Sequence, residues 1–492
     1  MVEPSKAVQW IPRISLTFLL ITAYFSVGFF QSDEHFQILE FAALKLGMIS
    51  PELMPWEYTT QTRPTLQPLL ALWIHKFFQL LHWDDPFVIS GVLRMLSALI
   101  SYLGMWSVYE FFRKRYSSTK NQDWFLFLSF LLWCNIFIGV RFSSEGWSGS
   151  LFLISLLVYN KLSHRRNLQF LTMGLIFGLA YLCRYQVGLM IFGFCLWLLF
   201  IKREKISGLL VLTLGFSLVF GIGILIDRWF YGEWTLTVWN YLDQNIIHDK
   251  ISDFGVDPWW NYLLQVFLAL IPPFSLIVII GYLFLIIRQP GNVLVWTLLP
   301  FILVHMLIGH KELRFLFPLL GFVPAIVSES ISLLNSRKKT DILQRRWVKR
   351  AGMAFVAING LLLLFVATTS FDRTTPLYRY VYRHFPESTT IYYLGTDPYK
   401  LGHLSYYKRT NLTVKAIESL SELDHLSNRK ILLVVDRPNK LSDVNADVQL
   451  LYSSIPGWVW YLNFNHWIER TLAWYLYEVT PDSVNSTYPQ NR

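Results

Sequence analysis

The segment that decides the fold covers residues 207–229 and reads SGLLVLTLGFSLVFGIGILIDRW. No charged side chain occurs in it before Asp227 and Arg228, which stand near its far end. A helix needs about 20 mostly apolar residues to cross the hydrocarbon core of a bilayer. The segment meets this requirement and is therefore predicted to be a transmembrane helix.

The rest of the chain has the composition of a membrane protein. Of its 492 residues, 53% are hydrophobic, 17% aromatic and only 15% charged, whereas soluble domains carry about 25% charged residues. The net charge of +10 would suit nucleic-acid binding only if the basic residues formed a stripe on a soluble face. They occur instead in short clusters between apolar runs, so no nucleic-acid partner is expected. The three cysteines lie within apolar runs, which argues against a disulfide framework and a cysteine-based metal site.

About eleven segments are predicted as spans, so we expect an all-α polytopic membrane protein with lipids around it. Residues 66–83 are also apolar, but His75 and Lys76 stand in their middle, and central charge is costly in a span. This segment is predicted to be a helix along the membrane surface, with a twelfth span as the alternative. The predicted spans are 10–30, 87–112, 123–140, 147–160, 168–184, 187–201, 207–229, 263–287, 293–309, 314–334 and 351–370.

The basic residues indicate the orientation, because short basic loops stay in the cytoplasm. Every second loop is basic when the N-terminus is placed inside, and the loops 31–86 and 230–262 and the tail then lie outside. We therefore expect a transmembrane domain at 1–370 and an extracytoplasmic domain at 371–492. The basic loops contain Arg113–Arg115, Lys161–Arg166, Lys202–Lys205, Arg288 and Arg337–Arg350.

The tail is predicted to form a small α/β domain. It contains three short β-like runs, at Thr390–Leu394, Ile431–Val435 and Val448–Tyr452, and polar stretches such as Val414–Leu426 that are typical of helices. At the other end of the chain, the first apolar run is too long for a signal sequence, so no cleavable signal is expected.

Ionisable residues gather near the predicted outer ends of the spans. Such residues indicate function, although long cations can also extend to the lipid headgroups. Carboxylates and cations that come from several spans at one level fit a polar cavity that opens outward. The residues concerned are Arg94, Arg141, Glu145, Arg184, Asp227, Arg228 and the group from His310 to Arg314.

Two strings offer chemically useful groups. Ser32-Asp33-Glu34 begins the first outer loop, where the two acids suit either the first turn of a helix or the acceptance of a proton from a substrate hydroxyl. Arg63, further along this loop, is suited to pair with a phosphate or a lipid headgroup. His310-Lys311-Glu312-Leu313-Arg314 packs three potential cations and one carboxylate into five residues. This set suits a phosphate, with Glu312 holding a cation, and not a divalent metal.

These strings resemble motifs of the Alg9-like, or GT22, mannosyltransferases, which are multi-spanning enzymes of the GT-C type. His310 to Phe315 resembles the complete His-Lys-Glu-x-Arg-Phe motif, and Asp33 to Gln37 looks like the acidic, aromatic-rich element of the first luminal loop. Arg63 to Pro68 is similar to the stretch after that element but lacks its more common Arg-Ser-Tyr sequence. The resemblance extends to about Pro318. The first loop is most similar to the branch that adds the third mannose of the glycosylphosphatidylinositol glycan.

The resemblance implies transfer of mannose from a polyprenyl (dolichyl) phosphate carrier to a sugar hydroxyl of a lipid-linked glycan, with inversion to an α linkage. It implies no cofactor and no metal, and the sequence has no Asp-x-Asp pattern that would hold one. Asp33 is then the expected catalytic base, with Glu34 as the alternative. The expected phosphate ligands are His310, Lys311, Arg314 and Arg63, and the supporting residues are Glu312, Arg184, Arg141 and Glu145.

Two other functions stay open at this point. One is a GT-C glycosyltransferase that uses a different lipid-linked sugar, and the other is a lipid or sugar transporter, although no repeated halves are found. The sequons Asn411-Leu412-Thr413 and Asn485-Ser486-Thr487 would suit the lumen of the endoplasmic reticulum. The topology fits a bacterial inner membrane equally well, and in both cases the active site is expected on the luminal or periplasmic side.

Overall fold

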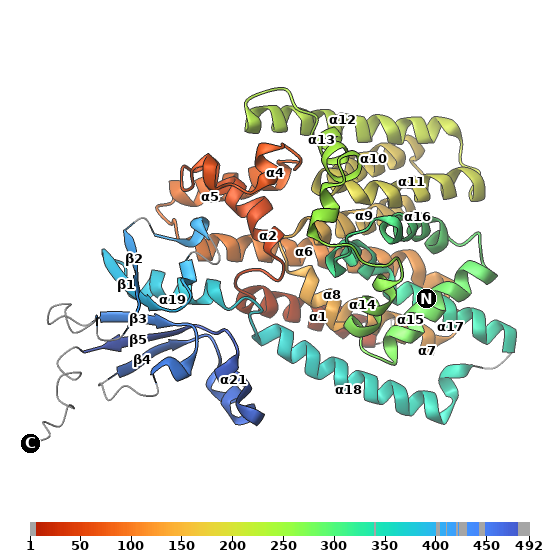
Figure 1. Ribbon diagram of the computed structural model, residues 1–492. Coiled ribbons are helices and arrows are strands. Elements are labelled where there is room, and N and C mark those ends of the chain that lie inside the picture. Colours follow the sequence, from red (N-terminus) through yellow and green to blue (C-terminus); the bar gives the residue numbers. More distant parts are fainter. Residues whose placement is uncertain are drawn as a thin grey trace, which may run out of the picture.

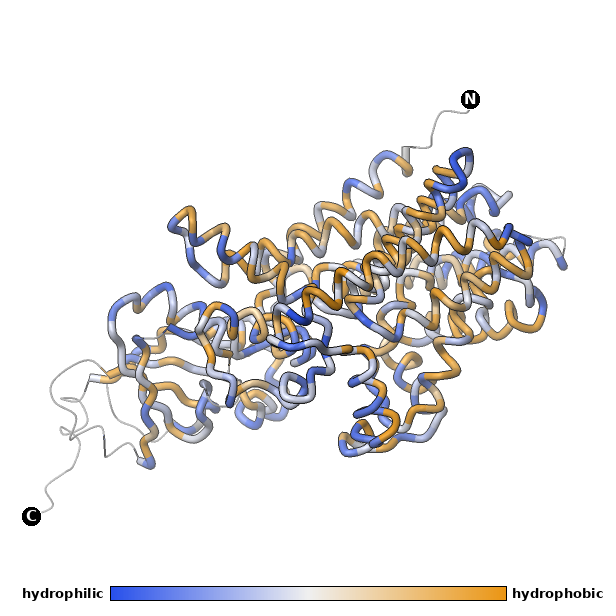
Figure 2. The backbone as a smooth tube through the Cα atoms, turned by 90° about the horizontal axis from the view of Figure 1, so that it is seen from above, coloured by the Kyte–Doolittle hydropathy of each residue, from blue (hydrophilic) through white to orange (hydrophobic). Residues whose placement is uncertain are grey.

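The computed structural model describes residues 6–338, 341–399, 404–409, 411–419, 422, 431–441 and 448–480. It has a large helical part and a smaller C-terminal part built on a sheet (Figure 1). Figure 2 shows hydrophobic residues along much of the helical part and hydrophilic residues gathered in its loops and at its ends. The sequon at Asn485 lies outside the described residues.

The helical part contains a long helix or a pair of shorter helices at each predicted span. The range 263–287 is divided in two at Pro272 and Pro273, and the range 123–140 is divided at Leu132. The segment before α17 is a 3-10 helix, Leu313–Phe322. The helices are α1 (Lys6–Phe25), α6 (Pro86–Phe112), α7 (Thr119–Leu131), α8 (Trp133–Gly139), α9 (Ser144–Lys161), α10 (Arg166–Cys183), α11 (Gly188–Leu196), α12 (Ile206–Tyr231), α14 (Asn261–Ala269), α15 (Phe274–Arg288), α16 (Val293–Leu307), α17 (Val323–Lys338) and α18 (Arg346–Thr368).

The protein is a multi-pass membrane protein, but the number of spans is lower by a strict measure of length and hydropathy. Among the described residues, six helices are long and apolar enough to cross a membrane, and α15 with α16 adds a seventh if this pair, bent by 114°, is one span. The helices α9, α10 and α11 stand at predicted spans but do not meet the measure. The count of eleven spans therefore stays a prediction.

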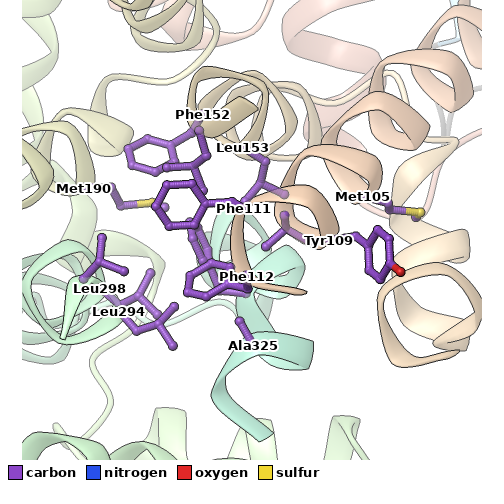
Figure 3. Close-up of a cluster of buried hydrophobic side chains, with 14 of the residues drawn as sticks. Met105, Tyr109, Phe111, Phe112, Phe152, Leu153, Met190, Leu294, Leu298 and Ala325 are labelled. Atoms are coloured by element: carbon purple, nitrogen blue, oxygen red, sulfur yellow. The ribbon is translucent and has the colours of Figure 1, made fainter. Parts of the chain in front are cut away.

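The core joins helices that are far apart in the sequence. Figure 3 shows Phe111 and Phe112 of α6 and Phe152 of α9 in a single cluster of buried side chains. Helices α10 and α12 approach so closely that a Cβ on Gly174 would run into the backbone oxygen of Leu212. Small residues at such crossings let membrane helices pack backbone to backbone.

The first outer loop folds against the helical part. It forms α2 (Ser32–Glu34), a π-helical segment (His35–Leu39), α3 (Glu40–Lys45), α4 (Trp56–Thr59) and α5 (Leu66–Leu80). Helix α5 has only 15 residues and exposes Trp73, Phe77 and Leu80, as expected for the predicted surface helix. Its buried His75 contacts the hydroxyl of Tyr406 in the C-terminal part, at 3.2 Å.

The loops that the sequence assigns to the same side contact one another. Arg115 pairs with Glu329 at 3.4 Å, and Ser118 Oγ donates to Asp341 at 3.2 Å, so the basic loops after α6 and α17 lie together. At the opposite end, Asp85 of the first outer loop pairs with Arg383 of the tail at 3.3 Å. This arrangement agrees with the alternation of basic loops.

The C-terminal part contains α19 (Thr374–His384) and one mixed sheet of order β2-β1-β3-β5-β4. The three predicted strands are confirmed as β1 (Thr389–Leu394), β3 (Ile431–Val435) and β4 (Val448–Ser453). The helical prediction for Val414–Leu426 is wrong at its start, because β2 (Leu412–Ile417) pairs in parallel with β1 along its whole length. Most of the remainder of that stretch lies outside the described residues. The strand β5 (Tyr475–Val479), antiparallel to β3 and β4, was not predicted.

Candidate functional site

The site lies where the helical part meets the C-terminal part, around the short helix α2 (Figure 1). The chain leaves α1 and turns at Gly28, whose φ of +82° is a conformation that favours glycine. A Cβ on Gly28 would also collide with the Asp372 side chain. This turn brings Asp33 and Glu34 to the end of the bundle.

Asp33 is the centre of a charged cluster. Its Oδ2 pairs with Arg314 and lies 3.9 Å from Nη2 of Arg63, and the amide of Gln37 donates to the same oxygen. Gln37 also donates to Glu57 at 3.0 Å. Burial alone would raise the pKa of Asp33, but the charges of Arg314 and Arg63 outweigh burial and hold that pKa below its usual range. The carboxyl group is therefore ionised at neutral pH.

Glu34 faces a different environment from that of its neighbour. Its Oε1 accepts from the backbone N–H groups of Phe30 and Gln31, at 3.3 and 3.2 Å, in a capping box at the start of α2. Burial raises the pKa of Glu34 to about 7, against the opposing charge of Arg141. A helix turns about 100° per residue, so the two adjacent carboxylates point in different directions.

The string at residues 310–314 meets this cluster through Arg314. Glu312 accepts from Nε and Nη2 of Arg314, at 2.6 and 2.8 Å, and lies 3.0 Å from Nε2 of His310. Glu312 therefore fixes the guanidinium that contacts Asp33. Lys311 turns another way, with its Nζ donating to the Ile308 carbonyl and lying 5.6 Å from the ring centre of Tyr262.

Glu145 and Arg184 join the cluster as a buried pair. Nη1 of Arg184 donates to Oε1 of Glu145 at 2.7 Å, and both side chains are at most 5% exposed. The guanidinium carbons of Arg184 and Arg314 lie 5.0 and 5.2 Å from the ring centre of Phe315. The pair therefore packs against the same aromatic ring as the residue that contacts Asp33.

Other ionisable residues of the outer level do not join this cluster. Arg141 is 1% exposed, lies 3.4 Å from the Gly28 carbonyl and packs on Phe137, on the Glu34 side of α2. Arg94 donates to the Ala23 carbonyl at 2.8 Å. The expectation that all of them line one cavity is not met, because Arg94 and Arg141 line a separate small pocket together with Glu34.

Asp227 also lies outside the cluster around Asp33, and its contacts stabilise the fold. It accepts from the backbone and the hydroxyl of Thr65, at 2.8 and 2.7 Å, and from the hydroxyl of Thr237 at 2.7 Å. It thus ties α12 to the start of α5 and to α13 (Thr237–Leu242). Its neighbour Arg228 stacks on Trp234, 4.0 Å from the ring centre.

Sequence reasoning missed two features of this region. Glu57 contacts Arg63 at 3.4 Å and holds Gln37 in place, and no motif marks it. His35 and Glu40 form a buried pair at 2.6 Å, and Glu40 also accepts from the backbone N–H of Tyr406 at 3.2 Å. The spacing of charged residues in the sequence does not distinguish residues that make such long-range contacts from residues that are exposed to solvent.

A large apolar cavity of about 600 Å³ lies beside the charged string. It is bounded by α8, α14, α15, α16 and the 3-10 helix Leu313–Phe322, and its lining is almost entirely hydrocarbon. Phe30 and Leu313 belong to the lining, and they lie close in the sequence to Asp33 and Arg314. Within the part of the chain that the structure describes, no three histidine, cysteine or acidic side chains are grouped in a way that could hold a metal ion.

Comparison with known proteins gives several matches. The chain is 26% identical over 356 residues to Mannosyltransferase APTG1 of Arabidopsis thaliana, covering 68% of this chain and 62% of that protein. It is 27% identical over 329 residues to GPI alpha-1,2-mannosyltransferase 3 of Bos taurus, covering 66% and 58%. The matched region thus spans about three fifths of the length of these relatives.

Among solved structures, the chain is similar to the crystal structures of ArnT from Cupriavidus metallidurans in the apo state and bound to undecaprenyl phosphate. The TM-scores are 0.49 and 0.47 at 10% identity, with 98% of this chain and 99% of each ArnT chain covered. The match that decides the family covers more than half of the sequence: residues 10–390 match the profile of the Alg9-like mannosyltransferase family. The chain therefore belongs to the Alg9-like mannosyltransferase family.

Proposed function

We propose that this protein transfers mannose from a polyprenyl phosphate carrier to a sugar hydroxyl of a lipid-linked glycan, with inversion at the anomeric carbon. The observation that carries the proposal is the contact of Asp33 with Arg314 and Arg63, together with a large apolar cavity whose lining includes Phe30 and Leu313, close in the sequence to Asp33 and Arg314. A lipid-linked donor needs hydrocarbon for its chain, cations for its phosphate and a base for the acceptor. Groups that suit these three requirements come from distant parts of the sequence, and the contact of Asp33 with Arg314 joins the proposed base to a proposed phosphate ligand.

The apolar cavity is the proposed place for the isoprenoid chain. A cavity lined by hydrocarbon excludes water and favours an apolar occupant. Its lining residue Leu313 stands between Glu312 and Arg314. The phosphate at the head of a chain in this cavity is therefore expected beside the charged string.

Lys311 and Arg314 are the proposed phosphate ligands, with His310 and Arg63 as weaker ones. No carboxylate among the described residues forms an ion pair with Lys311, so its charge is available to an incoming anion. Arg314 presents a fork that suits phosphate oxygens, and Glu312 holds that fork in place. His310 is bound to Glu312 and to the Gly255 carbonyl, at 3.0 and 3.2 Å.

Asp33 is the proposed catalytic base. Its carboxylate is ionised and 25% exposed, whereas Glu34 is buried and caps its own helix. A pKa near the working pH would favour Glu34, but a base must first be able to touch the hydroxyl that it deprotonates. A phosphate that binds to Arg314 would also weaken the pull of that arginine on Asp33 and raise the pKa of the carboxyl group.

The acceptor, the membrane and the side on which the tail lies are part of the same proposal. Several relatives are named GPI mannosyltransferases, and we propose a glycosylphosphatidylinositol precursor as the first acceptor to test. The endoplasmic reticulum membrane, or a bacterial inner membrane, is the proposed location, with Asp33 on the luminal or periplasmic side. The tail is proposed as a domain on that same side.

The test is a transfer assay with the purified chain, radiolabelled polyprenyl phosphate mannose and glycolipid extracts. Transfer of label to glycolipid supports the function, and GDP-mannose as the only donor should give none. Donors with other sugars separate mannosyl transfer from other GT-C reactions. A protein that moves intact donor lipid between leaflets without bond cleavage would be a transporter, contrary to the proposal.

A further inference from the structure

A second, polar pocket lies near Asp33. The residues that connect it with Asp33 differ from those that connect the apolar cavity with Asp33. Gln37 and Arg63, which both contact Asp33, belong to its lining. Arg314, the third neighbour of Asp33, belongs instead to the 3-10 helix that lines the apolar cavity. The two spaces share no lining residue. Asp33 thus contacts two residues that line the polar pocket and one residue of the 3-10 helix that lines the apolar cavity.

The polar pocket presents the groups that bind sugar hydroxyls. Amides come from Gln37, Gln67 and Gln186, and phenol hydroxyls come from Tyr185 and Tyr241. Each amide and each phenol both donates and accepts hydrogen bonds, as a sugar hydroxyl does. None of the described residues that line the pocket is a carboxylate, so the pocket does not suit a cation.

Three buried polar atoms at this pocket have no hydrogen-bond partner among the described residues. They are Oγ1 of Thr62, Nε of Arg63 and Nε of Arg184, and Thr62 and Arg184 are 1% and 5% exposed. Buried polar groups are nearly always paired, and an unpaired one costs free energy. Unsatisfied groups gathered at one pocket therefore indicate a polar ligand.

The helix α13 covers this pocket. The amide of Gln186 donates to the hydroxyl of Tyr241 across it, and Tyr185 bonds to Thr237 at the start of α13. Asn240 donates to the Gln61 carbonyl at 3.3 Å. The free space is about 20 Å³, which is enough for about one water molecule. A larger ligand must separate α13 from the segment that carries Gln186, and it would take over the hydrogen bonds that now join them.

We propose that the polar pocket under α13 binds the terminal hexose of the acceptor glycan. This inference rests on the proposed function and adds the acceptor site to it. With the hexose there, one hydroxyl faces Asp33, and the donor approaches from the Arg314 side. The hydroxyl oxygen forms a bond to the anomeric carbon, its proton passes to the Asp33 carboxylate, and the bond from the anomeric carbon to the phosphate oxygen breaks. Polyprenyl phosphate leaves with the electron pair.

The test compares two pocket variants with two controls. Gln186→Leu and Tyr241→Phe each remove hydrogen-bonding groups from the pocket. Gln244→Leu is the matched control, because Gln244 follows α13 but does not line the pocket. Ile302→Trp narrows the apolar cavity and is the control for the donor side.

The first measurement is transfer from polyprenyl phosphate mannose to an alkyl α-dimannoside. Loss of one hydrogen bond to a sugar should raise the KM for the dimannoside by about fivefold to tenfold in each pocket variant, with the KM for the donor unchanged. Ile302→Trp should show the opposite pattern, and Gln244→Leu should behave as wild type. If the pocket variants raise only the donor KM, or change neither, the assignment is overturned.

The second measurement does not require turnover. Methyl α-dimannoside binding to the protein in nanodiscs is followed by saturation-transfer NMR, and the two pocket variants should weaken the signal. Equal signals in wild type and both pocket variants, or none in wild type, contradict the sugar site. Binding that depends on the pocket in a protein that transfers no mannose supports the site and refutes the proposed function, so the two failures are distinguishable.

Discussion

The sharpest prediction concerns Asp33→Asn, which keeps the shape of the side chain and removes its charge. If Asp33 accepts the proton of the acceptor hydroxyl, the variant should lose about 100-fold to 10,000-fold in kcat, the range for loss of a general base. The KM for the donor should change little, since Lys311 and Arg314 remain. The measurement is initial rates of mannose transfer at saturating donor, normalised to folded protein.

The contacts of Asp33 indicate that Asp33→Asn should lower the stability of the folded protein only slightly. Asp33 is 25% exposed, and a partly exposed ion pair contributes about 1 kcal/mol or less. After the change Arg314 keeps Glu312, and Arg63 keeps Glu57. The melting temperature in detergent should therefore fall by only a few degrees. A large loss of kcat in a protein that still melts cooperatively would separate chemistry from folding.

Glu57→Gln is the matched control. It removes another carboxylate that contacts Arg63 and Gln37, but one that forms no ion pair with Arg314 among the described residues. Because Glu57 is not proposed to take the proton, we expect this variant to lose less than about tenfold in kcat, well short of the loss expected for a general base. If Asp33→Asn keeps turnover within threefold of wild type, or if Glu57→Gln loses as much as Asp33→Asn, the assignment of the base is refuted.

The remaining predictions concern neighbouring groups. Burial raises the pKa of Glu34 from 4.5 to about 7, so between these values the folded protein holds a proton that the unfolded chain has released. Stability should therefore fall as the pH rises from about 5 to 8, and Glu34→Gln should remove up to about 3 kcal/mol of this dependence in pH-dependent melts. Lys311→Met should raise the KM for the donor by about tenfold to a hundredfold, the value of one charge-assisted contact, without a change in melting temperature. Asp227→Ala should lower the melting temperature markedly, because it leaves three buried donors unsatisfied, and a protein that melts as wild type would contradict this role. Cysteines introduced at Ser336 and Ser388, both exposed, should react with a membrane-impermeant reagent from opposite sides, and labelling from one side would contradict the topology.

The positions of the helices could be predicted because a membrane span is a local property. The hydropathy of about 20 consecutive residues decides it, so each predicted range overlaps one helix or a pair of helices. The sequence analysis did not predict that some of these helices are interrupted. The predicted span 263–287 contains Pro272 and Pro273, which lie between the end of α14 and the start of α15, and prolines commonly interrupt helices. The start of Val414–Leu426 failed for the opposite reason, since pairing with β1 overrides its local preference.

The candidate site was partly visible in the sequence. Asp33 and Arg314 stand in dense charged strings, and such strings at a membrane boundary draw attention because of their cost. Their mutual contact spans about 280 residues and was not predicted. Glu57 has no unusual neighbours in the sequence and was missed, because only the fold brings it to Gln37 and Arg63. The supporting role of Arg141 stays a prediction, since it lines a small pocket with Glu34 and not the cluster around Asp33.

The charges of the cluster also explain why one arginine contacts the base before the reaction. A sugar phosphodiester carries one negative charge, and cleavage of its bond to the sugar leaves a phosphate with an additional negative charge. On the proposed mechanism, Asp33 becomes neutral in the same step, as it takes the proton of the acceptor. Negative charge therefore moves from one contact of Arg314 to another, while the net charge of the site stays constant. An arginine that Glu312 holds in a fixed orientation can follow this shift without reorganisation, which is the condition under which electrostatic stabilisation of a transition state is largest.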